Sequence, residues 1–538
     1  MYKVPPVENE NLQSYGAQSV ERPKLTAAIK KLRSQQPVEV PLVINGQEIK
    51  SSSKADQLNP SDKSVLAECW QASADHIQLA IEGALKAKVA WEAMAFHDRA
   101  AIFLKAADLL STKYRYEVMA ATMLGQGKNA WQAEIDAAAE LVDFWRFNCK
   151  YAEELYAVQP ARNAQGVWNR TEYRPLEGFV YAIAPFNFTA IAGNLSGAPA
   201  LMGNVVLLKP SPSAAYSNYL VMKIFLEAGL PPGVIQFVPG PAEEITEAVL
   251  QSRHFASLHY TGSTAVFKSL YQKIAQNLDR YVTYPRIVGE TGGKNFHVVH
   301  KSADLENAVV NTVRGAFEYQ GQKCSACSRL YISASLWPDF QRRMLEEIAK
   351  IKVGSPENYE NFMGPVIHQA AFDRLKTAID GAEKSGQECI ALGRCDDSKG
   401  FFVEPTVIVT KDPKHEVLTR ELFGPVLGVY VFEDEDFEPT LDLVDSATAY
   451  GLTGSIFAKD RSIVSMALKR LQNAAGNFYI NDKCTGAVVS QQPFGGARAS
   501  GTNDKAGSMS LLWRFVSMRS IKENMIDADS VLYPSNES

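Results

Sequence analysis

The sequence predicts an α/β protein with a doubly wound domain, a second α/β domain and an exposed β-flap. The first domain is indicated by uncharged runs of strand length that alternate with helical patterns between residues 179 and 288. The same alternation resumes after residue 290 and continues to about residue 480. Residues 168–174 alternate like an exposed hairpin strand. At 538 residues the chain is too long for one core, so we expect two or three domains.

The composition is that of a soluble globular protein. Hydrophobic residues make up 46%, charged residues 21%, and the formal net charge is −5, which offers no basic surface for nucleic acid. No charged residue occurs from Gly178 to Leu208, but prolines and asparagines interrupt this stretch and would be unpaired in lipid. We therefore expect a buried strand, a helix and a second buried strand there, and no membrane span.

Cysteine usage and the first residues of the chain indicate a compartment. Seven cysteines, most of them scattered singly, fit a reducing compartment better than a disulfide framework. The opening residues lack the apolar stretch of a signal peptide, and Glu8, Glu10 and Glu21 argue against a mitochondrial presequence. We expect a cytoplasmic protein; the alternative is the mitochondrial matrix, if the chain is a processed form.

The N-terminal third is predicted to be mainly helical. Residues 1–60 are polar and punctuated by proline, with one short strand at 40–44, and are expected to wrap the first domain. Apolar residues recur at helical spacing over 74–151, which predicts three or four helices and then an acidic helix at 132–147. Gly125-Gln-Gly-Lys-Asn-Ala matches a loose dinucleotide motif, but it follows a helical pattern instead of a strand. We expect no phosphate contact there.

The remaining elements set the expected domain boundaries. Residues 1–155 with 178–289 form one domain, 290–485 a second, and 156–177 with about 500–538 the flap. Expected strands are 179–184, 205–208, 234–238, 256–260, 297–299, 330–332 and 407–409; expected helices are 191–202, 305–319 and those after Ser213 and Pro241.

Cys324 is the candidate nucleophile. It stands in a run of small and polar residues, unlike a buried structural thiol, and the neighbouring Lys323 favours the reactive thiolate. Cys324 and Cys327 also form a C-x-x-C pair, which leaves a redox dithiol, half of a zinc site or ordinary small residues as alternatives. No second C-x-x-C completes a zinc site, so we expect no metal.

Two further residues fit a reaction at Cys324. Glu290 ends an apolar strand in a glycine-rich turn, where a carboxylate can act as a general base. Asn187 follows another apolar strand and supplies an amide of the kind that donates to a developing oxyanion.

Nucleophile, base, amide donor and glycine turns in this order resemble the aldehyde dehydrogenase superfamily along nearly the whole chain. The chain is most similar to the branch that oxidises glutamate γ-semialdehyde. The stretches that carry this closer match are Pro185-Phe-Asn-Phe-Thr-Ala, Gly289-Glu-Thr-Gly-Gly-Lys-Asn-Phe, Gly321-Gln-Lys-Cys-Ser-Ala and Asn481-Asp-Lys-Cys-Thr-Gly-Ala-Val-Val-Ser-Gln-Gln-Pro-Phe-Gly-Gly. The resemblance implies an aldehyde-dehydrogenase-like fold, in which the first domain is NAD-binding, the second is catalytic, and the flap is an oligomerisation element of a homodimer.

The resemblance also implies NAD as the cofactor. Tyr260-Thr-Gly-Ser follows a strand and opens a helix, so its backbone N–H groups can meet a pyrophosphate or simply begin a well-capped helix. Lys209 is implied to meet the adenosine ribose and Glu421 the nicotinamide ribose; the alternatives are a solvated lysine and an exposed turn glutamate. NAD is expected over NADP because no arginine follows Lys209. The implied cofactor residues are Ala184, Lys209, Gly262, Ser263, Thr264, Ala265, Val266 and Glu421.

The implied reaction is the oxidation of L-glutamate γ-semialdehyde, which is in equilibrium with pyrroline-5-carboxylate, to L-glutamate through a thioester, the second step of proline degradation. Backbone N–H groups of Gly486 and Ala487, with the Ser325 hydroxyl, could hold the substrate carboxylate. Phe188 and Phe494 could enclose the methylene chain. Glu140 could face the ammonium, unless it lies on a solvated helix face. Another aldehyde as substrate, or a non-catalytic protein on the same fold, are the alternatives.

Overall fold

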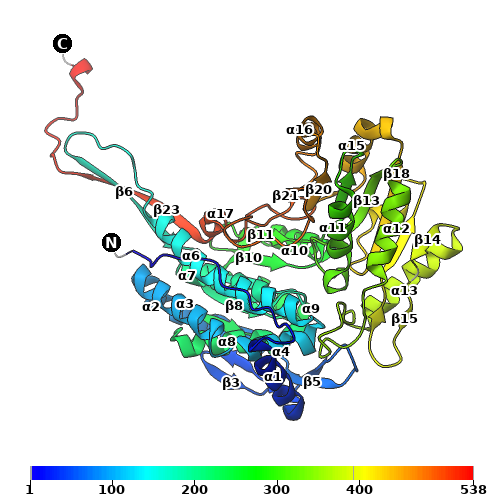
Figure 1. Ribbon diagram of the computed structural model, residues 1–538. Coiled ribbons are helices and arrows are strands. Elements are labelled where there is room, and N and C mark those ends of the chain that lie inside the picture. Colours follow the sequence, from blue (N-terminus) through cyan, green and yellow to red (C-terminus); the bar gives the residue numbers. More distant parts are fainter. Residues whose placement is uncertain (1–2, 392, 537–538) are drawn as a thin grey trace.

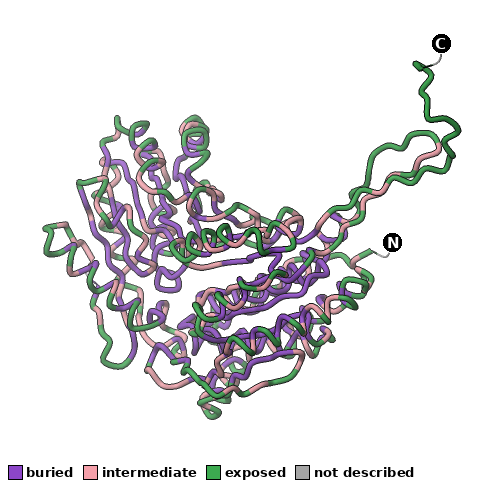
Figure 2. The backbone as a smooth tube through the Cα atoms, turned by 180° about the vertical axis from the view of Figure 1, so that it is seen from behind, coloured by how far each residue is buried: buried purple, intermediate pink, exposed green. Residues whose placement is uncertain are grey.

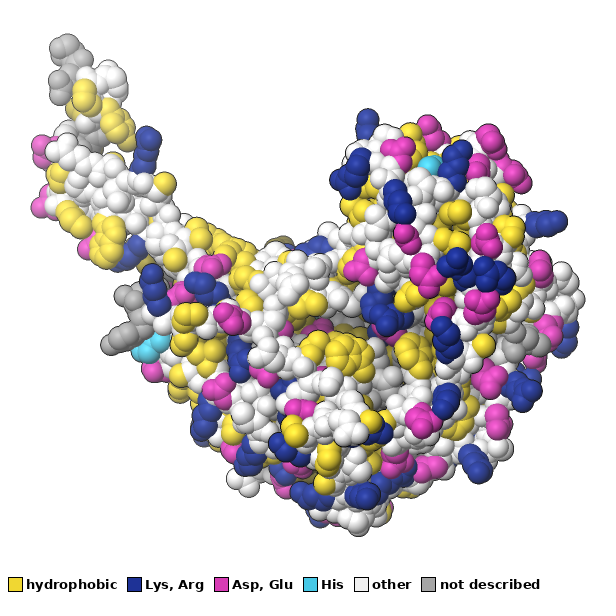
Figure 3. Space-filling model, viewed as in Figure 1, with side chains coloured by type: hydrophobic (Ala, Val, Ile, Leu, Met, Phe, Trp, Pro, Cys, Tyr) yellow, Lys and Arg dark blue, Asp and Glu magenta, His cyan; other side chains and the backbone are white. Residues whose placement is uncertain are grey.

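The computed structural model describes residues 3–391 and 393–536. Its framework is two seven-stranded, mainly parallel sheets, each covered by helices, from which a two-stranded ribbon projects (Figure 1). The described residues contain no helix that combines the length and the apolar character of a membrane span. On the face seen in Figure 3, acidic and basic side chains are interspersed.

The first sheet has the strand order β11-β10-β7-β8-β9-β2-β3. Its five central strands are parallel, and two antiparallel strands extend one edge. Their bounds are β11 (Arg286–Glu290), β10 (Phe255–Thr261), β7 (Phe179–Ile183), β8 (Val205–Lys209), β9 (Ile235–Phe237), β2 (Leu42–Ile44) and β3 (Gln47–Ile49). The predicted single strand at 40–44 is wrong, because β1 (Val38–Val40) pairs with β5 (Val65–Trp70) in a separate sheet that also contains β4 (Lys54–Leu58).

Alternate residues of the central strands enter two different cores. Val180 and Ala182 of β7 face a core with helices α3, α4, α6, α7 and α8, whereas Phe179 and Tyr181 face a core with α2, α9 and α10. Burial on both faces explains why these strands read as continuous apolar runs. The helices span α1 (Glu21–Gln35), α2 (Ala74–Ala93), α3 (Phe96–Ser111), α4 (Arg115–Gln126), α7 (Thr189–Leu201), α8 (Ala215–Ala228), α9 (Ala242–Leu250) and α10 (Thr264–Gln276).

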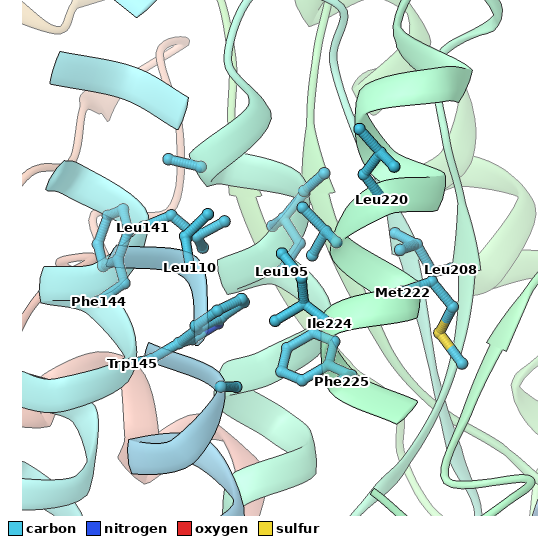
Figure 4. Packing of buried hydrophobic residues seen from close by; sticks show 14 of the residues in the cluster. Leu110, Leu141, Phe144, Trp145, Leu195, Leu208, Leu220, Met222, Ile224 and Phe225 are labelled. Carbon is cyan, nitrogen blue, oxygen red and sulfur yellow. The ribbon is translucent and has the colours of Figure 1, made fainter. Parts of the chain in front are cut away.

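Small residues of α7 allow α6 (Leu141–Tyr156) to approach closely. A Cβ at Gly193 would lie 2.4 Å from Cδ1 of Leu141, so a side chain there would separate the two helices. Trp145 of α6 packs against Phe225 of α8, with ring centroids 4.7 Å apart (Figure 4). This packing fixes the start of α7, which follows Asn187 and Phe188 directly.

The acidic helix expected at 132–147 is not one regular α-helix. The chain forms α5 (Ala130–Ala133), a π-helical turn (Glu134–Glu140) and then α6. π-helical turns occur often at functional sites. The turn contains Asp136 and Glu140, whose surroundings are described below.

The second sheet has the order β14-β17-β18-β13-β12-β20-β21 and is parallel except for β14. Its strands are β14 (Glu388–Ala391), β17 (Thr406–Val409), β18 (Val426–Phe432), β13 (Cys327–Ser333), β12 (Asn295–Val299), β20 (Thr453–Phe457) and β21 (Asn477–Ile480). Helices α11 (Leu305–Phe317), α12 (Trp337–Ile348), α13 (Gln369–Lys384), α15 (Phe437–Ser446) and α16 (Arg461–Arg470) accompany it. The sheet begins directly after the turn that carries Glu290.

The projecting ribbon joins two distant segments. β6 (Val167–Pro175) pairs antiparallel with β23 (Val516–Asn524), which follows α17 (Met509–Leu512). The reading of 168–174 as part of a local hairpin is therefore wrong. The residues of the ribbon are exposed or half-buried, except for Val516, in contrast to the buried strands of the main body (Figure 2).

Candidate active site

One cavity brings together the candidate nucleophile, the candidate base and every residue proposed to bind the substrate. Cys324 lies just before β13 and Glu290 at the end of β11, so the two sheets each contribute one reactive group. The other predicted residues that line this cavity are Ser325, Gly486, Ala487, Phe188, Phe494 and Glu140.

The Glu290 carboxyl is seated in a turn of glycines. Its Oε2 accepts a hydrogen bond from Gly496 N at 3.0 Å, while Oε1 is buried and has no partner among the described residues. A Cβ added at Gly495 or at Gly501 would lie 3.1 Å from Oε1, which leaves little room for side chains there. Burial raises the pKa of Glu290 well above its usual value. Once ionised, this carboxyl is therefore a stronger base than an ordinary carboxylate, which suits it to accept a proton.

The Cys324 thiol is not activated by its neighbouring lysine. Burial, together with the nearby carboxylates of Glu290 and Glu421, raises the pKa of Cys324 to about 12. Lys323 Nζ instead forms an ion pair with Glu318 Oε2 at 3.0 Å. The expectation that Lys323 favours the thiolate is thus wrong: Cys324 must lose its proton to a base during the reaction.

Asn187 lies against the turn that leads to Cys324. It is buried, and its Nδ2 donates a hydrogen bond to the backbone oxygen of Gln322 at 3.0 Å. An amide nitrogen carries two hydrogens, so one remains to donate to another acceptor. Asn187 is not among the residues that line the cavity, whereas the next residue, Phe188, is.

Polar groups gather at one end of the cavity. Ser325 Oγ and Thr485 Oγ1 are hydrogen-bonded at 2.7 Å, and Thr485 precedes Gly486 and Ala487 in the same loop. Gly486 has a φ of 92°, which favours glycine, and a Cβ there would meet only the Lys483 side chain within 4 Å. The backbone of this loop is therefore accessible from the cavity.

Glu140 lies in the cavity wall at the end of the π-helical turn. Burial, with a contribution from the carboxylate of Asp136, raises the pKa of Glu140 to about 8. The alternative of a solvated helix face is wrong, because Glu140 is only half-exposed and lines the cavity.

Two of the residues expected to bind NAD, Ala184 and Lys209, are buried at the carboxyl ends of β7 and β8. Lys209 ends β8 and is 4% exposed; its Nζ donates to the backbone oxygen of Pro210 at 3.2 Å. Burial lowers the pKa of Lys209 to about 8, so this lysine is not a solvated one. Ala184 N donates to Lys209 O at 3.0 Å, which holds the ends of β7 and β8 together.

The turn before α10 caps the helix, as one reading of its sequence predicts, and leaves only part of its backbone free for a pyrophosphate, as the other predicts. Ser263 is the N-cap of α10, and its Oγ accepts a hydrogen bond from Val266 N at 3.4 Å, as in a capped helix. Gly262 N is already bonded to Glu290 O at 3.1 Å, so this N–H is not free for a ligand. Thr264 and Ala265 are the first residues of α10. The backbone N–H groups at this helix N-terminus are therefore the part of the turn that suits an anion.

Glu421 precedes β18 of the second sheet and contacts the glycine turn that follows Glu290. Its Oε1 accepts a hydrogen bond from Gly293 N at 2.8 Å, and burial raises its pKa. Glu421 is half-buried.

Sequence reasoning missed Thr485 and the cluster of Glu318 with two lysines. Burial alone would raise the pKa of Glu318, but the charges of Lys323 and Lys483 lower it to about 2. The sequence could have indicated Thr485, because it directly precedes Gly486 in the loop expected to bind the substrate carboxylate. No motif in the neighbouring sequence indicates Glu318.

The C-x-x-C pair does not act as a unit. Both cysteines are free thiols, and Cys327 lies with Cys484 and His297 in a buried cluster whose ligand atoms are all within 4.8 Å of one another. His297 Nε2 accepts a hydrogen bond from Cys484 N at 3.1 Å, so its lone pair is already in use. A dithiol or zinc site shared by Cys324 and Cys327 is not supported by this arrangement.

Comparison with known proteins assigns the chain to one family. The sequence pattern of the aldehyde dehydrogenase family matches residues 48–521, and the chain belongs to this family. It is 61% identical over 537 residues to a delta-1-pyrroline-5-carboxylate dehydrogenase of Agaricus bisporus, covering 99% of this chain and 98% of the relative. A mitochondrial delta-1-pyrroline-5-carboxylate dehydrogenase of Emericella nidulans is 59% identical over 543 residues, covering 100% and 95%.

A solved structure agrees over the full length. The crystal structure of the delta-pyrroline-5-carboxylate dehydrogenase from Mycobacterium tuberculosis bound with NAD has a TM-score of 0.96 and 46% identity, covering 100% of this chain and 99% of that one. The aldehyde-dehydrogenase-like fold expected from the sequence is confirmed.

Proposed function

We propose that this protein oxidises L-glutamate γ-semialdehyde, in equilibrium with pyrroline-5-carboxylate, to L-glutamate with NAD, as the second step of proline degradation. The observation that carries the proposal is one cavity that holds Cys324 and Glu290 beside a loop with an accessible backbone at Gly486. The high identity to delta-1-pyrroline-5-carboxylate dehydrogenases over whole chains supports the same substrate.

The residues at the crevice fit NAD. Lys209 offers a buried ammonium whose only hydrogen bond among the described residues is to a backbone oxygen, and Glu421 offers a carboxylate. We assign Lys209 and the backbone at Ala184 to the adenosine ribose, the start of α10 (Ser263, Thr264, Ala265 and Val266, with Gly262 as the turn) to the pyrophosphate, and Glu421 to the nicotinamide ribose. NAD, when bound, supplies the hydride acceptor.

The chain's own residues perform the remaining steps. The Cys324 thiol gives its proton to the Glu290 carboxylate, and the sulfur forms a bond to the aldehyde carbon. Asn187 Nδ2 and the Cys324 backbone N–H hold the oxyanion, which expels a hydride and becomes a thioester. Glu290 first releases this proton to solvent and then takes a proton from water, whose oxygen attacks the thioester. The Cys324 thiolate leaves, recovers a proton from Glu290, and glutamate is released.

The cavity suits a substrate with charged groups remote from its aldehyde. Gly486, Ala487 and Ser325 are assigned to the carboxylate, Glu140 to the ammonium, and Phe188 and Phe494 to the methylene chain. A panel of aldehydes with NAD tests this directly. The semialdehyde should give the highest kcat/KM; a preference for propanal or hexanal would indicate another substrate in the same family.

The ribbon of β6 and β23 is assigned to oligomerisation, in a homodimer. Its exposed side chains include Trp168 and Met518, and the exposed Met525 and Ile526 follow β23 directly; such apolar surface beside unpaired strand edges usually has a partner. Light scattering after size exclusion should give a dimer, and deletion of residues 516–538 should give a monomer. A monomeric full-length protein would reject the assignment.

Of the two compartments that the sequence leaves open, we favour the mitochondrial matrix. The Emericella nidulans relative is named as mitochondrial. Fractionation of cells that express the untagged protein from its own gene should place the activity in mitochondria; activity in the cytosolic fraction would favour the alternative.

A further inference from the structure

The segment Gln126–Lys128 is part of the dinucleotide-like pattern from which we expect no phosphate contact, and it contacts two turns of the active site. α4 ends at Gln126, and Gly127 follows with a φ of 72°; a Cβ there would lie 2.9 Å from Pro365 O. Lys128 is fully buried, and its Nζ donates a hydrogen bond to Asp136 Oδ2 at 2.7 Å. A buried lysine is costly unless it is paired, so this charge calls for an explanation.

One side of the segment contacts the turn that carries Asn187. Lys128 Nζ lies 3.7 Å from the ring centroid of Phe188, within the range of a cation–π interaction. Its partner Asp136 accepts hydrogen bonds from Thr189 N at 3.0 Å and Ala190 N at 2.8 Å, which fixes the start of α7. Gln126 Nε2 donates to Phe186 O at 2.8 Å. The residues on both sides of Asn187 are thus held from this segment.

The other side contacts the turn that leads to Cys324. Lys128 Nζ lies 4.6 Å from the ring centroid of Tyr319, whose hydroxyl donates to Gln126 O at 2.9 Å. Gln320 Nε2 donates to Gly127 O at 2.9 Å. Tyr319 and Gln320 have positive φ values of 51° and 54°, a conformation that side chains adopt only when their surroundings enforce it.

We infer that Lys128 is a positioning residue that sets the distance between the Asn187 amide and Cys324 by holding both turns at once. Its ammonium is the one group of the segment that touches a ring from each turn, and its pairing with Asp136 extends the contact to α7. The inference deepens the proposed function and rests on it, because it takes Asn187 as the donor to the oxyanion.

A double-mutant cycle with Asn187 tests the inference. Lys128→Met should slow the pre-steady-state formation of NADH about 100-fold, the scale expected when a catalytic group is misplaced by about 1 Å. In the Asn187→Ala background the same change should cost less than about 3-fold, because the group it positions is already gone. An equal loss in both backgrounds, or no loss in either, would overturn the inference.

Controls separate positioning from folding and from substrate choice. Lys105→Met, an exposed lysine on α3, should leave the NADH rate unchanged. If Lys128→Met does not fold, Lys128→Met/Asp136→Asn removes both charges while the single Asn oxygen still accepts from one of the two α7 N–H groups. Asp136→Asn alone is then the reference, and the same cycle applies. The wild-type rate with the semialdehyde reports on the proposed function separately; if another aldehyde is preferred, the cycle with that aldehyde still decides the role of Lys128.

Discussion

Glu290 accepts a hydrogen bond from the backbone N–H of Gly496 through Oε2 at 3.0 Å, and Glu290 lines the cavity shared with Cys324. Gly496 belongs to the glycine turn after β21, far from Glu290 in the chain. The second sheet's segment therefore orients a base that the first sheet supplies. Burial raises the pKa of both groups, so the ionised Glu290 carboxylate is a stronger base than an ordinary one, and the Cys324 thiol needs such a base to lose its proton. The site is built to move one proton between them.

Only one thiol of the C-x-x-C pair is expected to react. Cys324→Ala should lower kcat by at least about 10⁴-fold, the scale of losing a covalent nucleophile. Cys327→Ala should keep most activity, since this thiol lies with Cys484 and His297, away from the cavity lining. Steady-state rates of the two variants check this. An equal loss in both would favour redox chemistry.

Adding bulk at Ala487 should affect the semialdehyde selectively. Ala487→Leu covers the backbone that is assigned to the substrate carboxylate, and losing a charged hydrogen bond costs about 1.5–3 kcal/mol, or roughly 10–100-fold in KM. The KM for propanal, which has no carboxylate, should change much less. The assignment fails if both aldehydes lose affinity equally.

The affinity for the semialdehyde should depend on the ionisation of Glu140. With its pKa raised to about 8, this carboxyl is protonated at lower pH and can attract the ammonium only as pH rises through that value. The KM for the semialdehyde should therefore rise by up to about tenfold per pH unit below this pKa. Glu140→Gln should remove this dependence, and the KM for propanal serves as the control. A KM that is constant from pH 6 to pH 9 in the wild type contradicts the role of Glu140.

Discrimination between cofactors should be clear but not absolute. The residues after Lys209 are Pro-Ser-Pro-Ser, which provide no arginine for the 2′-phosphate of NADP and no acid to repel it. We expect kcat/KM to favour NAD by roughly tenfold or more, because an unpaired phosphate near this strand end would be poorly solvated. Comparable values for the two cofactors would show that another group accepts the phosphate.

The sequence predicted those features that depend on short segments. Strands such as β7 and β8 were recognisable because burial on both faces makes them continuously apolar, and reactive residues such as Glu290 were recognisable at strand ends. The break between β1 and β2 was missed, because each pairs with a strand distant in sequence.

Long-range contacts explain the other errors. The pairing of β6 with β23 joins segments that are far apart in the chain, so neither carries a turn signal for the other. The pKa of Cys324 depends on carboxylates that only the folded chain brings near, and Lys323 is drawn away by Glu318. No local pattern points to Lys128, because the positioning role we infer for it depends on contacts with two turns that only the folded protein brings together.

The most direct test of the mechanism is to trap the thioester. Glu290→Gln retains an oxygen that can accept from Gly496 N but cannot take a proton from water, so hydrolysis should slow by about 10²–10⁴-fold. Glu290 also takes the thiol proton, so NADH should form more slowly in this variant; but the thiol, with a pKa of about 12, is a stronger acid than water, so hydrolysis should slow more. With NAD and the semialdehyde, the variant should therefore release one slow burst of NADH and keep the acyl group on Cys324, which intact mass and peptide mapping detect. Normal turnover, or an acyl group on a residue other than Cys324, would contradict the mechanism.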